Sequence, residues 1–148
     1  MGAPAYQDIA PERVPEVSPS AGVTIRVVAG QAAGATGPVA APATEPVYLD
    51  IALEAGASHV QPLPSGHNAF VYVFDGKVVV GADTLARGSL GVLGEGRSVA
   101  LNAPDGAARC LLVAGRPLGE PVVKYGPFVM NTQQEIREAI ADYQAGRF

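Results

Sequence analysis

Charged residues are scarce in this sequence. They make up 16% of the 148 residues, the formal net charge is -4, and the few basic residues do not cluster. Nucleic acids and anionic membranes are bound by basic surfaces, so this composition argues against either as a direct partner. No apolar run approaches the length that is needed to cross a bilayer.

Targeting signals and paired cysteines are also missing. Residues 1–5 have neither the basic nor the apolar region of a signal peptide. Gly2 follows Met1, but Tyr6 stands where a myristoylation motif has Ser or Thr. The one cysteine, Cys110, cannot form an internal disulfide, and its apolar surroundings predict a core residue rather than a nucleophile. These absences together predict a cytoplasmic protein.

Turn-forming residues, in contrast, are abundant. The chain has 18 glycines and 13 prolines, and 48% of its residues are hydrophobic. Its length fits one domain with a substantial core. Apolar segments with the character of strands are separated by turns, and they lie at 23–28, 47–54, 58–61, 69–74, 77–80, 90–93, 98–101 and 109–114. Many short strands at this spacing favour an all-β sandwich or barrel.

The two ends of the chain differ from this pattern. Residues 1–20 contain four prolines and are predicted to form an extended arm, followed by a single domain over 21–148. The Ala/Gly/Pro-rich residues 31–46 are predicted to form a long surface loop.

The C-terminal end has the pattern of a helix. Thr132 and Glu135 have capping-box spacing, and Ile136, Ile140 and Tyr143 form one apolar stripe. We expect this stripe to pack on the rest of the fold.

The strand at 69–74 is predicted to be the centre of the β core. It runs into Asp75 and Gly76 and then into the strand at 77–80, which is typical of a β-hairpin with an Asp-Gly turn. Alternation places Asn68, Phe70, Tyr72 and Phe74 on one face of the strand, and His67, Ala69, Val71 and Val73 on the other. We expect the aromatic face to fill the interior and the valine face to lie outside.

This strand and its turn resemble the first conserved motif of the cupin superfamily, and the chain resembles the C-terminal half of a pirin. The segments that carry the resemblance lie at 6–9, 66–73, 115–122, 125–132, 135–136 and 142–148. The resemblance implies a cupin-type jelly-roll β-sandwich with one C-terminal helix. It also implies that the chain begins at the linker between two cupin halves, without the half that holds the metal.

The resemblance implies a metal-site pattern that this sequence does not keep. In metal-binding cupins, two histidines, a glutamate and a later histidine hold one iron-like ion and leave positions open for dioxygen or substrate. Counted from the flanking turns, these positions fall on Pro62, Pro64, Asn68 and Leu101. Proline and leucine cannot ligate a metal, and an asparagine amide is a weak neutral ligand. We therefore expect no metal and no cofactor in this domain.

Two histidines remain to be assigned. His67 directly precedes Asn68, and we expect it to cap the strand entry or to hydrogen-bond a neighbouring loop. The alternative is a rebuilt metal site from His59, His67 and a carboxylate such as Asp50 or Glu54, although no carboxylate has matching spacing.

Asn68 and Tyr72 are the candidate site residues, because they share one face of the central strand. They are expected either to line a small polar pocket inside the roll or to be buried polar side chains that are hydrogen-bonded by their surroundings. No nucleophile has a recognisable base beside it, so the sequence predicts no catalytic residue, and it names no small-molecule ligand.

Three functional hypotheses remain. The first is a metal-free structural or binding module that pairs with a second cupin domain or forms a homodimer through an apolar outer surface including Val71 and Val73. The second is an enzyme or metal-dependent sensor in its own right. The third is an excised piece of a pirin, for which the resemblance implies iron and quercetin-dioxygenase-type activity in the other half and, for some members, transcriptional co-regulation.

Overall fold

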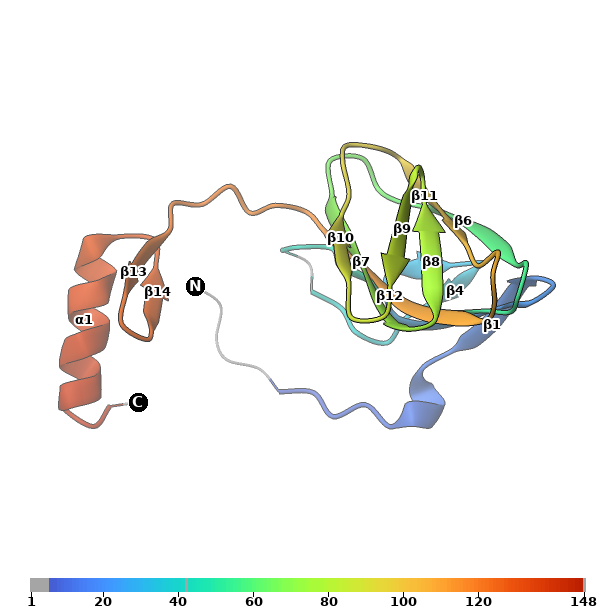
Figure 1. The fold of residues 1–148 in the computed structure, drawn as a ribbon. Coiled ribbons are helices and arrows are strands. Elements are labelled where there is room, and N and C mark those ends of the chain that lie inside the picture. Colours follow the sequence, from blue (N-terminus) through green and yellow to red (C-terminus); the bar gives the residue numbers. More distant parts are fainter. Residues whose placement is uncertain (1–5, 42, 148) are drawn as a thin grey trace. The chain divides into compact units, whose positions relative to one another are not determined.

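The chain forms two compact units, Met1–Pro117 and Leu118–Phe148. The computed structural model describes residues 6–41 and 43–147. The first unit is a sandwich of two antiparallel sheets, and the second is a β-hairpin with a helix (Figure 1). The predicted all-β class with one C-terminal α-helix is confirmed for the described residues.

The larger sheet of the sandwich has six strands. Their order across the sheet is β1 (Glu16–Ser20), β2 (Val23–Ala29), β5 (Val47–Leu53), β12 (Ala108–Gly115), β7 (Asn68–Asp75) and β10 (Leu90–Val92). The smaller sheet has the order β6 (Ser58–Pro62), β11 (Ser98–Asn102), β8 (Lys77–Val80) and β9 (Asp83–Ala86). A small ribbon of β3 (Gln31–Ala32) and β4 (Ala35–Thr36) lies in the segment that was predicted to be a loop.

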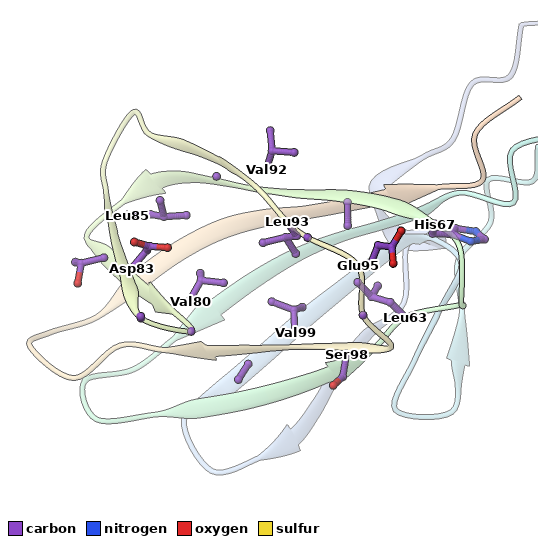
Figure 2. A pocket seen from close by; sticks show the side chains of 18 residues that line it. Leu63, His67, Val80, Asp83, Leu85, Val92, Leu93, Glu95, Ser98 and Val99 are labelled. Carbon is purple, nitrogen blue, oxygen red and sulfur yellow. The ribbon is translucent and has the colours of Figure 1, made fainter. Parts of the chain in front are cut away.

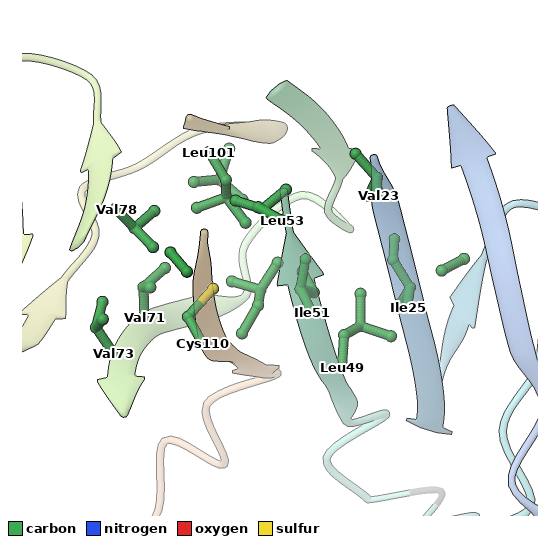
Figure 3. Packing of buried hydrophobic residues seen from close by; sticks show 14 of the residues in the cluster. Val23, Ile25, Leu49, Ile51, Leu53, Val71, Val73, Val78, Leu101 and Cys110 are labelled. Atoms are coloured by element: carbon green, nitrogen blue, oxygen red, sulfur yellow. The ribbon is translucent and has the colours of Figure 1, made fainter. Parts of the chain in front are cut away.

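Aliphatic side chains fill the space between the two sheets. The larger sheet contributes alternate residues of β2, β5, β7 and β12, and the smaller sheet contributes Val78, Val99 and Leu101. Figure 3 shows Val78 and Leu101 beside Val71 and Cys110 of the opposite sheet. Full burial of one such side chain stabilises the fold by about 1.5–3 kcal/mol, so this cluster dominates the stability of the unit.

The faces of β7 are the reverse of the prediction. Val71 and Val73 are fully buried, whereas Phe70, Tyr72 and Phe74 are half-buried on the outer face of the sheet. The reason is register: Val71 is paired with Leu112 of β12, which is also fully buried. Both faces of β7 are apolar, so the sequence alone did not specify which of them points inward.

The predicted hairpin between β7 and β8 is also wrong. The two strands belong to different sheets, and β8 pairs with β9 and β11. Only Gly76 separates them, which is one residue fewer than the shortest common hairpin loop. Gly76 has a φ of 66° and accepts no side chain, because an added Cβ would lie 2.3 Å from the carbonyl oxygen of Ala107. The chain therefore turns a corner here and crosses from one sheet to the other.

The predicted N-terminal arm is partly structured. Pro11–Arg13 form a 3-10 turn, and Glu16–Ser20 form β1, which pairs with β2 at the edge of the larger sheet. Pro19 is compatible with this strand because an edge strand leaves one row of backbone groups unpaired. Residues 1–5 of the arm lie outside the described residues.

The second unit consists of β13 (Val123–Tyr125), β14 (Phe128–Met130) and α1 (Gln133–Gln144), and the helix packs on the two strands. The predicted capping box is confirmed: the Glu135 backbone N–H donates to the Thr132 hydroxyl, and the Glu135 carboxylate accepts from the Thr132 N–H at 2.8 Å. The Thr132 hydroxyl also donates to this carboxylate, at 3.0 Å, and it lowers the pKa of Glu135 most, followed by the backbone N–H of Thr132. Within the described residues no helix is long and apolar enough to span a membrane.

The buried stripe of α1 differs from the predicted one. Ile136 and Ala139 are buried, Ile140 is half-buried, and Tyr143 is 68% exposed although its ring meets that of Phe128 edge to face. The helix is thus held by its own hairpin, and the role predicted for Tyr143 belongs to Ala139.

Replacing Ile136 by alanine is expected to melt this helix. A buried Ile-to-Ala change costs about 2–5 kcal/mol, and so small a unit has little other burial to compensate. Far-UV circular dichroism should lose its helical component, while Gln133→Ala, at an exposed position of the same helix, should keep it. A wild-type helical signal in Ile136→Ala would contradict this packing.

Candidate functional site

A cavity of ≈ 580 Å³ lies at one end of the sandwich, where β8, β9, β10 and β11 meet the start of β7. Its apolar walls are formed by Leu63, Val80, Leu85, Leu93 and Val99 (Figure 2). Asp83 and Glu95 add two carboxylates to the lining, and His67 lies at one end of the group (Figure 2). The cavity thus combines apolar walls with nearly as much polar surface.

The four positions at which the cupin pattern has metal ligands do not form a metal site. Pro62, Pro64 and Asn68 are exposed, and Leu101 is fully buried in the core. On β7 the inward-facing residue is Ala69 rather than Asn68, which follows from the reversed faces of this strand. Neither alanine nor leucine donates an electron pair, so the donor set does not fit the iron-like ion that the cupin pattern implies.

His67 has the structural role that was predicted for it. Its Nε2 lies 2.9 Å from the backbone carbonyl oxygen of Glu45, in the loop before β5. Because a carbonyl oxygen only accepts, Nε2 must donate this hydrogen bond. This hydrogen bond links the residue before β7 to the 43–46 segment.

His59 has a different partner, Gln61, two residues along β6. The His59 Nε2 and the Gln61 Oε1 are 3.1 Å apart, and the Gln61 amide donates to the carbonyl oxygens of Pro62, at 3.0 Å, and Gln31, at 3.3 Å. Gln61 is 3% exposed, and these bonds satisfy it. Gln61 points inward because side chains alternate along β6 and its neighbour Val60 points outward.

The alternative metal site from His59 and His67 is not assembled either. Each ring is held by a different neighbour, and the part of the chain that the structure describes has no group of three His, Cys, Asp or Glu side chains placed to hold a metal ion.

Asn68 and Tyr72 share one face of β7, as alternation predicts, but that face is not the interior. Asn68 is exposed and borders a hollow that Ser65, His67 and Arg97 also line. Tyr72 lies on the outer face of the larger sheet, between its register partners Leu111 and Leu90. The two residues therefore do not form the predicted internal pocket.

Cys110 is expected to be unreactive in the folded protein. It is fully buried, and burial, together with the nearby Asp50 carboxylate, raises the pKa of its thiol to about 12. Only the thiolate reacts readily, so a thiol reagent at mildly alkaline pH should label Cys110 only after denaturant is added. Rapid labelling of the native chain would contradict this prediction.

The same shift gives a pH dependence of stability. A folded-state pKa above the unfolded value stabilises the fold fully below the unfolded pKa of 9.0, and this contribution is lost as the pH rises toward about 12. Conversion of Cys110 to alanine should remove this component of the alkaline decline in melting temperature.

Residues 48–148 match the family model of the pirin C-terminal cupin domain. This chain belongs to that family. A pirin-like protein of Caulobacter vibrioides is 41% identical to it over 100% of the chain and 54% of the relative. Human pirin is 41% identical over 97% of the chain and 51% of the relative. The chain thus spans about half the length of these pirins.

A solved structure of a similar protein has the same fold. The crystal structure of quercetin 2,3-dioxygenase from Acinetobacter baumannii matches this pirin C-terminal cupin domain with a TM-score of 0.88 and 37% identity. The match covers 97% of the present chain and 50% of the dioxygenase. The cupin-type sandwich that the sequence predicted is therefore shown both by the fold and by a relative.

Proposed function

We propose that this pirin C-terminal cupin domain is a structural and binding module that pairs with another cupin domain or with itself, and that it does not carry out metal-dependent oxidation. The observation that carries the proposal is the donor set. The positions equivalent to cupin ligands hold Pro62, Pro64, Asn68 and Leu101, of which only the Asn68 amide offers a donor, a weak neutral one. The described residues also contain no group of three His, Cys, Asp or Glu side chains that could hold a metal ion.

A second role is supported by the length of the relatives. The dioxygenase from Acinetobacter baumannii is about twice as long as the match, as are the pirins. In this role the domain is the non-metal half of a quercetin 2,3-dioxygenase-type enzyme and supports a metal-binding cupin half. Both roles assign the same task to the present residues, which is to bind a neighbouring domain. One buried, unpaired cysteine suits a reducing compartment such as the cytoplasm.

The experiment is an oxygen-uptake assay with quercetin and added iron(II). The present chain is expected to give no uptake above the background of iron and quercetin alone. The full-length dioxygenase from Acinetobacter baumannii serves as the matched positive control. Uptake that rises with the concentration of the chain, and that is lost in both His59→Ala and His67→Ala, would overturn the proposal.

A further inference from the structure

A second cavity, an open groove of ≈ 760 Å³, lies within the first unit. Three parts of the chain line it: the β3–β4 ribbon with its flanking glycines, the segment that leads into β5, and residues 61–64 at the end of β6. The lining is mainly apolar, and its most buried members are Ala32, Val47 and Gln61. A volume of this size lies within the range of about 300–1,000 Å³ that is usual for small-molecule sites.

The buried side chain of Gln61 connects two of these parts. Its Nε2 donates to the carbonyl oxygen of Gln31 in β3, at 3.3 Å, and to that of Pro62 in β6, at 3.0 Å. These hydrogen bonds hold the β3–β4 ribbon against the end of β6. The groove between them is therefore preformed, as small-molecule sites usually are.

The segment that leads into β5 is held in a strained conformation. Glu45 has a φ of 45°, in the left-handed region that residues with a side chain rarely adopt. Its carbonyl oxygen accepts from the His67 Nε2 at 2.9 Å, and its N–H donates to the carbonyl oxygen of Ala41 at 2.9 Å. The Arg116 NH2 group donates to the carbonyl oxygen of Ala43 at 3.0 Å. Strained residues persist only where the surroundings impose them, and they gather at ligand sites.

The charge of the lining favours an uncharged occupant. Glu45 is the one charged side chain among the described residues that line the groove, and its carboxylate lies 3.5 Å from the Arg116 guanidinium. An ionic ligand would lose hydration here without meeting an opposite charge of its own. A largely apolar molecule without charge matches both this pair and the apolar lining.

The backbone of the lining favours a small molecule over a peptide. Three of the lining residues are prolines, at 46, 62 and 64. Proline has no backbone N–H, whereas a peptide strand that is added to a sheet edge needs a row of donors and acceptors. Side-chain contacts, rather than a backbone ladder, are what this groove offers.

We propose that this groove binds an uncharged, largely apolar organic molecule. Leu63, Val39 and Val47 supply its larger aliphatic contacts, and the small alanines and glycines beside them leave room for the ligand. The site goes beyond the proposed function, because it does not depend on pairing with a second domain. Its failure would therefore leave the proposed function standing.

The site is tested by fluorescence titration of the full chain with Nile red, an uncharged apolar dye whose emission rises when it leaves water. Wild type is expected to bind one dye per chain in a saturable manner. Ala40→Trp and Thr36→Trp each add a large side chain at an exposed lining residue, and each is expected to weaken binding at least about tenfold. Ala86→Trp is the matched control, because Ala86 is exposed on β9 and does not line the groove.

Circular dichroism and thermal melting verify that each chain is folded. The two blocking variants lie on different segments, so either one decides the question if the other does not fold. Weakening that Ala86→Trp does not share supports the groove as the binding site. Wild type without saturable binding overturns the inference, and so do folded blocking variants that bind the dye as tightly as the control.

Discussion

Replacing Val71 by lysine should prevent the domain from folding. Val71 is fully buried between the sheets, where its register partner is Leu112, and the structure offers no acid on this face of β7 to pair with an ammonium group. Burying an unpaired charge costs several kcal/mol, which is comparable to the whole stability of a typical domain, about 5–15 kcal/mol. Circular dichroism and thermal denaturation should show no cooperative transition.

The neighbouring residue provides the matched control. Tyr72 lies on the opposite, outer face of the same strand and is half-buried there, so Tyr72→Lys keeps the charge in contact with water. We expect Tyr72→Lys to fold with a cooperative transition and Val71→Lys not to fold. The reverse result would restore the arrangement predicted from the sequence, with the aromatic face inside.

Replacing Gly76 by alanine should be the most damaging of the glycine substitutions in the turns. A Cβ at this position would lie 2.3 Å from the carbonyl oxygen of Ala107 and 2.9 Å from the Cα of Ala108. Both are backbone atoms, of the first residue of β12 and of the residue before it, so relief requires that this part of the chain move. Overpacking of this kind costs about 1–3 kcal/mol, in addition to about 1–2 kcal/mol for a left-handed backbone at a non-glycine residue.

The variant Gly81→Ala separates the steric cost of the added Cβ from the cost of the left-handed backbone. The φ of Gly81 is 61°, close to the 66° of Gly76, but an added Cβ there meets no atom within 4 Å. Gly81→Ala should therefore lose only the conformational part, and chemical denaturation should show a clearly larger loss of unfolding free energy for Gly76→Ala. Equal losses in the two variants would mean that the corner at Gly76 has room for a side chain.

Local signals in the sequence predicted local structure well. Strand β5 was predicted because Val47, Leu49, Ile51 and Leu53 alternate with more polar residues, and all four are buried. The helix was predicted from a capping box that lies within four residues of sequence, and both of its hydrogen bonds are present. In each case the pattern and the contact that it implies lie within one element.

Information from distant parts of the chain decided the rest. Strand β8 pairs with β11, some twenty residues later, and nothing within 77–80 distinguishes that partner from β7. The inward face of β7 is set by its register with β12, because Phe70 and Val71 are both apolar. The prediction of the candidate site was wrong for the same reason. Asn68 and Tyr72 were expected in the interior only because the wrong face of β7 was expected to point inward.

The central claim is that the domain holds no metal ion, and metal content tests it most directly. The purified chain is dialysed against metal-free buffer and its iron, nickel, zinc and manganese are measured by mass spectrometry, with the full-length dioxygenase from Acinetobacter baumannii treated in parallel. The account predicts far less than one ion per chain, because Pro62, Pro64 and Leu101 offer no donor side chain, the Asn68 amide is a weak neutral ligand, and the described residues hold no group of three His, Cys, Asp or Glu side chains placed for a metal ion. Near-stoichiometric metal that survives dialysis and is lost on His67→Ala would contradict it.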